Sequence, residues 1–558
     1  MRRIKFTTVK SGILALTLSG AGLAHADTII EHVRGYTLNQ KGQLQQFSAI
    51  AFDEQGKVID IGKAAALAAK LPRATRIDGA GKTLLPGMID AHGHVLSLGV
   101  SQIQLSLRAT ADLAQAQQAI ADYARRYPQH QWIMGGEWNQ ANWKLGRFPT
   151  AQEIDAVVKE RPVWLSRVDG HAGWANSRAM QLAGIDETTP DPAGGKIEKD
   201  AQGKPNGILI DAAMKLVDKV LPPPSEAEQR AALDLALQEL ARVGVTSAHD
   251  AGVSESADRL FREYADQGKL STRIYGMIRG TDGFFDQAAQ QGPLLAYGND
   301  HYALRAVKLF ADGALGSRGA ALLAPYSDAP HTQGLLFKSG DDMAAMIEKA
   351  ASKGYQVNVH AIGDAGNRQI LDGFARLPAS ASVNLRHRIE HAQVVALSDI
   401  PRFRQLGILP SMQPTHATSD MNMAEDRVGA ERIKGAYAWR SFLQQGSRIA
   451  CGSDFPIESP NPFWGVHAAV TRQNMQGQPA KGWYANQAMT VHEALRCFTL
   501  DAAYAAHQEN TLGTLEKGKW ADFILIDQDL LHMPVKDIYK IKVLQTWVGG
   551  RQVYPASK

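Results

Sequence analysis

The chain has 558 residues, with 60 Lys plus Arg against 56 Asp plus Glu, 44% hydrophobic residues and only two cysteines. This composition is typical of a folded soluble protein and excludes a disordered chain or a disulfide-built scaffold. A nucleic-acid binder needs a basic surface, and no nucleic-acid partner is expected here, because the balance of charge does not suggest such a surface. The formal net charge of +4 arises in the first 26 residues, which contain no acid and hold Arg2, Arg3, Lys5 and Lys10.

Residues 1–26 are predicted to be a cleavable secretory signal. They combine a basic start, an apolar run at 12–23 and the small-x-small sequence Ala24-His25-Ala26, which places the cleavage after Ala26. A membrane anchor is the alternative, but the run is too short and too rich in Ser, Thr and Gly to span about 30 Å of hydrocarbon. The sequence therefore predicts a periplasmic or secreted protein without a stable membrane anchor. Arg2-Arg3 hints at twin-arginine export, and the Sec route stays open.

The two ends of the mature chain share a pattern of short alternating strands. Residues 28–61 and 521–554 show it, with turns such as Asp53-Glu54-Gln55-Gly56. Short strands need partners that cover their edges. We therefore expect residues 27–82 and 511–558 to pair into one small β-sandwich domain built from both chain ends. Two separate appendages are the alternative.

Between the ends, apolar β-rich runs alternate with helical patterns, as a parallel α/β sheet requires. The first run, at 83–90, is followed by a long segment that contains helical stretches at 109–127 and 225–243. The remaining runs lie at 245–249, 273–277, 306–310, 355–360, 385–391, 408–413 and 448–452. Eight such units predict an α/β fold, a (β/α)8 TIM-like barrel over residues 83–510, with a large insertion after strand 1 at about residues 100–240.

Candidate metal ligands follow several of these predicted strands. His92 and His94 end the first strand, and residues two apart point to the same face, so both imidazoles can reach one ion. His-x-His alone also occurs by chance in loops. However, His360, His391 and Asp454 each end or follow another strand, at the barrel edge where active sites form. Nitrogen and oxygen donors in this combination favour zinc.

Lys308 lies in the run Ala306-Val307-Lys308-Leu309-Phe310, where it alternates with apolar neighbours and points toward the barrel interior. A bare buried ammonium is costly. The lysine must therefore pair with an acid such as Asp312, lose its proton, or form a carbamate with CO₂ that could bridge two cations. The residues alone leave the ion pair and the carbamate open.

Seven motifs resemble the metal-dependent amidohydrolase superfamily, and within it the amidohydrolase 3 group that includes N-substituted formamide deformylases. The similarity covers essentially the whole mature chain, to the stretch at 515–522. It implies that His92, His94, His360 and His391 bind metal, that Lys308 is carboxylated and bridges two Zn²⁺ ions, and that Asp454 is both ligand and catalytic proton shuttle. Some members of the superfamily use a single metal, so one or two ions are expected. The matching motifs are residues 86–94, 169–177, 307–313, 360–364, 389–391, 413–416 and 452–454.

The same resemblance implies contacts with substrate from His171, Trp174, Arg318 and His416. Trp174 is one of five tryptophans in the predicted insertion. These tryptophans could form an aromatic lid over the barrel mouth or the insertion's own core, because tryptophan is among the most buried residues. The remaining four are Trp132, Trp138, Trp143 and Trp164.

The predicted function is hydrolysis of a non-peptide C–N bond in a small, apolar amide. Zinc lowers the pKa of bound water from about 15.7 to about 7, so a metal-bound hydroxide can attack the carbonyl while Asp454 transfers the proton to the leaving nitrogen. Alternatives with the same site are a cyclic amide or carbamate hydrolase, a deaminase, and a non-catalytic metal- or ligand-binding regulatory relative.

One serine and two cysteines are further candidates for chemistry or cross-linking. Ser453 lacks the Gly-x-Ser-x-Gly elbow of a serine hydrolase. Cys451 and Cys497 are expected to be buried free thiols, with a bridge as the alternative. The sequence leaves the oligomeric state open and is compatible with a homo-oligomer.

Overall fold

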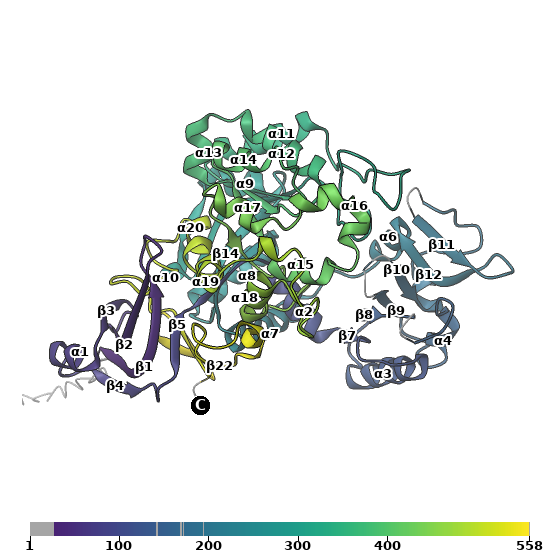
Figure 1. Ribbon diagram of the computed structural model, residues 1–558. Helices are drawn as coiled ribbons and strands as arrows, with labels where there is room; N and C mark the ends of the chain where they lie inside the picture. The colour runs from purple at the N-terminus through teal and green to yellow at the C-terminus, as the bar shows by residue number, and fades with distance from the viewer. Residues whose placement is uncertain (1–26, 141–142, 168–169, 171, 193–194, 557–558) are drawn as a thin grey trace, which may run out of the picture.

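The computed structural model describes residues 27–140, 143–167, 170, 172–192 and 195–556 (Figure 1). The predicted secretory signal, residues 1–26, lies outside the described residues. Within the described ranges, no helix has both the length and the apolar character needed to cross a membrane.

Eight parallel strands form the barrel, as predicted. They are hydrogen-bonded in chain order, and α-helices surround them (Figure 1). The last strand closes against the first, because Gly93 forms a parallel bridge with Phe455 and the Asp454 amide donates to the His92 carbonyl at 2.7 Å. The strands are β6 (Met88–Gly93), β13 (Val245–Val253), β14 (Arg273–Arg279), β16 (Tyr302–Phe310), β17 (Gln356–Ala361), β18 (Arg388–His391), β19 (Leu409–Met412) and β20 (Ala450–Cys451).

The run at 83–90, expected to be one strand, is two strands in two different sheets. β5 (Thr83–Pro86) pairs with strands of the small β domain, whereas β6 pairs with β13 in the barrel. Gly87 separates them, and a Cβ at this position would lie 2.1 Å from Thr246 Oγ1, so the close approach requires glycine. Every residue of both strands is buried, so the sequence pattern could not reveal the change of sheet between them.

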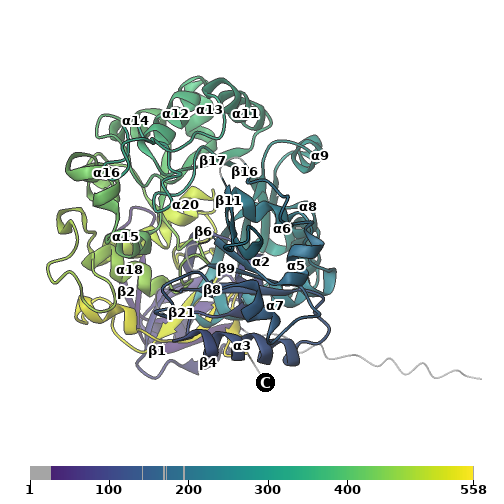
Figure 2. The ribbon, with the colours of Figure 1, turned by 90° about the vertical axis from the view of Figure 1, so that its right-hand side faces the viewer.

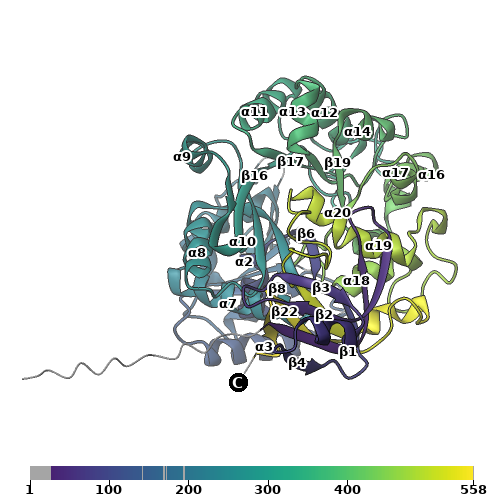
Figure 3. The ribbon, with the colours of Figure 1, turned by 90° about the vertical axis from the view of Figure 1, so that its left-hand side faces the viewer.

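Both chain ends contribute to one small β domain. Its sheet runs β23-β22-β21-β5-β1-β2-β3, with β4 (Thr75–Asp78) paired to β1. Figure 3 shows the purple N-terminal and yellow C-terminal strands side by side. Strands β2 and β21 are not neighbours, yet Phe52 and Phe523 have ring centroids 5.9 Å apart, so the sheet folds over a shared core. It is one continuous sheet rather than two. The strands not yet given are β1 (Thr28–Leu38), β2 (Leu44–Phe52), β3 (Val58–Gly62), β21 (Phe523–Ile526), β22 (Val543–Val548) and β23 (Arg551–Tyr554).

The insertion between β6 and β13 carries a third sheet, in the order β11-β12-β10-β9-β8-β7. It lies on the opposite side of the barrel from the small β domain (Figure 1). All five tryptophans of this region are at most 9% exposed, and Trp138, Trp143 and Trp174 contact one another edge-on or tilted. They therefore form the insertion's own core rather than a lid. The strands are β7 (Leu105–Ser106), β8 (Ile133–Trp138), β9 (Val163–Arg167), β10 (Ala172–Ala175), β11 (Gly195–Lys199) and β12 (Pro205–Asp211).

Three of the longer helices pack around the insertion and the first barrel strands. α3 (Leu113–Arg126) belongs to the insertion, and Ala116 and Ile120 on one of its faces are fully buried. α7 (Glu226–Arg242) leads from the insertion back into the barrel and begins with a capping box, in which the side chains of Ser225 and Glu228 bond each other's backbone amides. α8 (Glu255–Asp266) follows β13 and buries Leu260, Phe261 and Tyr264.

Cys451 and Cys497 form a disulfide, so the expectation of two free thiols is wrong. Cys451 ends β20, and Cys497 ends α19 (Val491–Cys497). The bridge joins a strand of only two residues to a helix outside the barrel. Its Cys451 end lies three positions before Asp454. Sequence spacing could not predict this pairing, because the fold alone brings residues 46 positions apart into contact.

Replacing both cysteines by alanine is expected to lower the free energy of unfolding by about 4 kcal/mol, because the unfolded chain regains the entropy of an open loop. Chemical unfolding of the oxidised protein and of the double variant measures this difference. A reducing agent should destabilise the native protein by a similar amount and leave the double variant unchanged. Equal stability of the native protein with and without reductant would contradict the prediction.

Candidate active site

The six predicted metal ligands line one cavity of about 760 Å³ at the carboxyl ends of the barrel strands. Lys308 comes from β16, His360 from β17 and His391 from the end of β18. His92 lies in β6 and His94 follows it, while Asp454 follows β20. Parallel strands bring side chains that are far apart in the sequence to the same rim, and active sites form at this rim in such barrels.

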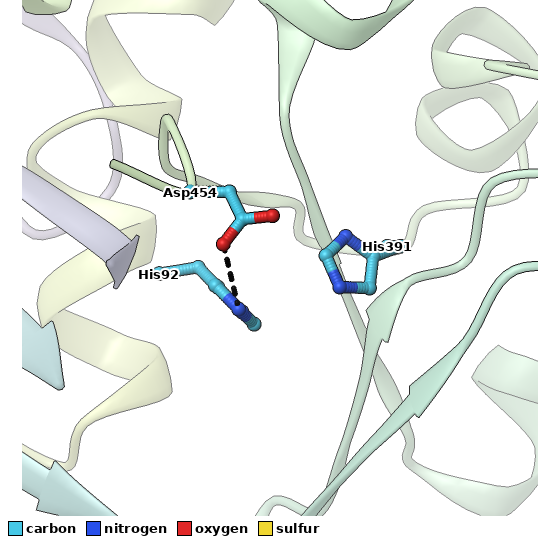
Figure 4. Close-up of side chains that lie close together, drawn as sticks. All are labelled: His92, His391 and Asp454. Atoms are coloured by element: carbon cyan, nitrogen blue, oxygen red, sulfur yellow. Dashed lines mark ion pairs between the residues drawn. The ribbon is translucent and has the colours of Figure 1, made fainter. Parts of the chain in front are cut away.

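Distances between the ligand atoms match those of a metal site. Asp454 Oδ1 lies 3.3 Å from His94 Nε2 and 3.5 Å from His92 Nε2. Ligands bonded to tetrahedral zinc at about 2.0–2.1 Å are themselves separated by roughly 3.3 Å. His92, His391 and Asp454 each offer an atom within 4.8 Å of the other two (Figure 4). The His391 ring centroid also lies 4.6 Å from that of His360.

The protonation states also fit a metal. Burial, followed by the charge of Lys308, lowers the pKa of His92 to about 4 and that of His360 to about 3. Neutral imidazole is the form that binds metal. His360 Nε2 is buried without a hydrogen-bond partner, which is costly unless something binds it. Burial alone would raise the pKa of Asp454, but His94, His92 and His391 hold it well below its usual range, so the carboxylate stays ionised.

Lys308 does not pair with Asp312, one of the alternatives that the sequence left open. Asp312 instead accepts backbone hydrogen bonds from Ala321, Ile362 and Gly363 at 2.8–3.0 Å. Lys308 is 1% exposed, and its Nζ lies 3.1 Å from His92 Nε2. Burial lowers the pKa of Lys308 to about 8, although Glu390 and Asp454 act in the opposite direction. The lysine thus points directly at the ligand atoms.

A buried Arg388–Glu390 pair beneath His92 was missed by the sequence reasoning. Glu390 accepts a hydrogen bond from His92 Nδ1, and Arg388 Nε lies 2.7 Å from Glu390 Oε1. Arg388 also donates to the Ala91 carbonyl and to Ser411 Oγ. This arrangement turns His92 Nε2 toward the cavity and fixes its tautomer. The available signal was two charged residues, two positions apart, on a strand that is otherwise buried.

Replacing Glu390 by glutamine is expected to weaken metal affinity by about 10- to 100-fold, because His92 loses the charged partner that orients it. Titration against a competing chelator measures this change. The control is Glu509→Gln, whose carboxylate pairs with Arg386 at 2.7 Å. Glu509 does not line the cavity. Unchanged metal affinity in Glu390→Gln would show that this hydrogen bond does not support the site.

The loop that carries Asp454 is fixed to the first strand. Asp90 accepts hydrogen bonds from the Ser453 amide and from Ser453 Oγ, the latter at 2.6 Å. A Cβ on Gly452 would lie 2.5 Å from the backbone nitrogen of His92, so glycine permits this close approach. Ser453 is thereby engaged in holding the loop, which leaves the serine-hydrolase alternative without support.

The predicted substrate contacts divide into three groups. His416 lines the cavity, with its Nε2 3.8 Å from Asp454 Oδ2. Trp174 does not line it, because the residue is fully buried in the insertion core and donates to the Thr150 carbonyl. Arg318 is likewise outside the cavity lining and pairs with Asp328 at 2.9 Å. The structure therefore places His416 at the cavity and does not bring Trp174 or Arg318 into its lining, while His171 lies outside the described residues.

Comparisons with known proteins agree with this fold and site. Residues 75–554 match the amidohydrolase family. The chain is 34% identical over 515 residues to the protein LONG AFTER FAR-RED 3 of Arabidopsis thaliana, covering 90% of this chain and 87% of that protein. It is 29% identical over 498 residues to the N-substituted formamide deformylase of Arthrobacter pascens, covering 86% and 90%.

A solved structure is similar over nearly the same length. The crystal structure of an uncharacterized metal-dependent hydrolase from Pyrococcus horikoshii OT3 aligns with a TM-score of 0.78 and 27% identity, covering 91% of this chain and 99% of that one. Because the family match spans most of the sequence and the barrel carries a cluster of His and Asp side chains that could hold a metal ion, the chain belongs to the amidohydrolase family and is a hydrolase.

Proposed function

We propose that this amidohydrolase cleaves the C–N bond of a small, non-peptide amide with the help of zinc. The observation that carries the proposal is the convergence of four histidines, Lys308 and Asp454 on one cavity. His92, His94, His360, His391 and Asp454 would hold one or two ions. A bound zinc ion supplies Lewis acidity, which polarises a carbonyl and makes water a nucleophile near neutral pH.

Lys308 is proposed to be carboxylated. Its neutral amine would add to CO₂ and release one proton, giving a carbamate anion. Three observations support this modification: the side chain is buried, Asp312 is engaged elsewhere, and Nζ lies 3.1 Å from His92 Nε2. A carbamate would replace a costly buried cation with an anion among metal-binding groups.

Asp454 is proposed to move the proton during the reaction. Its carboxylate lies among His92, His94 and His416, at the point where the ligand atoms meet. As an ionised base it can accept a proton from attacking water and pass it to the leaving nitrogen. This transfer is needed because an amide anion is a very poor leaving group.

The cavity wall fits a small substrate that is at least partly apolar. Phe310, Leu315, Ile362 and Ile457 line it together with the ligands. The similarity to an N-substituted formamide deformylase supports an open-chain amide. We further propose that the protein is exported, which rests only on the pattern of residues 1–26.

A panel of open-chain amides, cyclic amides, carbamates and amines tests the function. The protein is stripped of metal with a chelator and then reloaded with zinc in the presence of bicarbonate. Mass spectrometry of the products separates C–N cleavage of an open-chain amide from ring opening and from deamination. Zinc-dependent hydrolysis of open-chain amides is expected. Turnover of another class alone would overturn the assignment, and bound metal without any turnover would favour a non-catalytic relative.

A further inference from the structure

One wall of the catalytic cavity holds a carboxylate that neither the metal site nor the proposed proton transfer uses. Asp420 lines the cavity and is the last residue of α15 (Pro414–Asp420), the helix that follows β19. Helix α15 packs beside α18 (Pro462–Thr471; Figure 2). His416, four positions earlier, lies on the same helical face. His416 Nε2 is 3.8 Å from Asp454 Oδ2, and Asp420 lies about one helical turn beyond His416, roughly 6 Å along the axis.

The Asp420 carboxylate is held in place by a buried network. Tyr437 donates its hydroxyl hydrogen to Oδ2 at 2.6 Å, and Gln393 donates to the same oxygen at 3.1 Å. The two donors are 2% and 4% exposed, and they are hydrogen-bonded to each other at 2.8 Å. The fully buried Arg472 in turn donates to the Tyr437 carbonyl at 2.9 Å. Both hydrogen bonds to the carboxylate end on Oδ2, and Oδ1 receives neither of them.

This position is unfavourable for a carboxylate that serves only the fold. The C-terminal end of a helix carries partial negative charge and favours cations. Among the described residues, no lysine or arginine pairs with Asp420, whose hydrogen-bond partners Tyr437 and Gln393 are both uncharged. Glu458 lines the same cavity and accepts a hydrogen bond from Ser419, so it adds further negative charge nearby. Lys308 is the one lysine or arginine among the described lining residues, and it belongs to the metal site.

We infer that Asp420 is a specificity-determining residue, and that the substrate is an amide carrying an ammonium group about one helical turn from the scissile carbonyl. This inference rests on the proposed function and names its substrate class. The ammonium would lie against Asp420 Oδ1, while apolar parts of the substrate contact Phe310, Leu315 and Ile362. The ammonium would neutralise the negative charge of the carboxylate and of the helix end.

Kinetics with matched substrates test the inference. The zinc-loaded protein is assayed with an N-(ω-aminoalkyl)formamide and with the N-alkylformamide of equal length, in which a methyl group replaces the ammonium. The native protein should prefer the cationic formamide. Asp420→Asn should reduce the ratio of the two kcat/KM values by about 10- to 100-fold, the usual effect of losing a hydrogen bond to a charged group. Asp372→Asn, which removes a surface carboxylate paired with Arg402, should keep the native ratio.

A structural role for Asp420 would give a different result, since both kcat/KM values would then fall together and the ratio would not change. That outcome, or a native preference for the neutral formamide, overturns the inference. Calorimetry with a short alkyltrimethylammonium ion, which cannot ligate metal, keeps the test independent of turnover. Tighter binding to the native protein than to Asp420→Asn is expected even if no amide is cleaved. Equal binding would refute the role of Asp420 separately from the proposed function.

Discussion

Replacing Lys308 by alanine is expected to lower kcat/KM by about 1000-fold or more, which corresponds to about 4 kcal/mol of transition-state stabilisation. The side chain is buried, and its Nζ lies 3.1 Å from His92 Nε2. If it is carboxylated, the substitution removes an anionic ligand from the centre of the metal site. Steady-state kinetics on an amide substrate, together with metal analysis of the purified variant, measure the effect.

Added short carboxylic acids separate a lost ligand from a damaged fold. Formate or acetate can occupy the space left by the side chain and supply the missing anion, so partial rescue of Lys308→Ala is expected. Lys519→Ala is the matched control, because this lysine is likewise buried, at 2% exposed, yet it donates to the Leu512 carbonyl and does not line the cavity. It should keep the native kcat/KM and show no rescue. Full activity of Lys308→Ala without added acid would rule out the bridging anion.

The barrel and the convergence of the candidate ligands on one cavity could be predicted because both follow from local rules. Strand alternation decides which side chains point inward, and His360, His391 and Asp454 lie where a strand ends. In a parallel barrel all such positions meet at one rim, so separate sequence signals combine into one site. The same reasoning applied to Lys308 showed that it must be buried, although its partner could not be chosen until the structure showed Asp312 bonded elsewhere.

Other features depend on contacts that no local pattern encodes. The disulfide joins Cys451 and Cys497 only because α19 packs outside β20. The change of sheet at Gly87 depends on the close approach of Thr246 from another strand. Trp174 lies in a motif that resembles a substrate-binding segment, but its burial among Trp138 and Trp143 is decided by how the insertion folds.

The pairs that support the site were the hardest to predict, because their partners are distant in the sequence. Arg388 and Glu390 are close neighbours, yet their role depends on His92, which lies 298 positions before Glu390. Asp420 gives no sequence signal beyond its place four residues after His416. Its significance comes from Tyr437, Gln393 and the direction of α15, which only the folded chain brings together.

Replacing Asp454 by asparagine is expected to lower kcat by about 100- to 10,000-fold, because the amide cannot carry a proton. Most of the bound metal should be retained, because the amide oxygen can still face the ion. Asparagine is the appropriate substitution, since residue 454 has a positive φ of 61°, a conformation that Asn tolerates better than Ala. Metal analysis and kcat are measured on the same preparation, so loss of the ion and loss of proton transfer are distinguished.

A series of anilides with leaving amines of graded basicity makes this test specific for proton transfer. Protonation matters most for a strongly basic leaving amine, so the rate of Asp454→Asn should fall more steeply along the series than the rate of the native protein. Asp364→Asn provides a control. Asp364 is a buried carboxylate that does not line the cavity and accepts a hydrogen bond from the Leu323 amide at 2.8 Å. This variant should keep the slope of the native protein. Parallel slopes for Asp454→Asn and the native protein would mean that Asp454 does not protonate the departing nitrogen. Another group at the rim would then have to deliver that proton, and His416, whose Nε2 lies 3.8 Å from Asp454 Oδ2 and which is not among the predicted metal ligands, is a candidate.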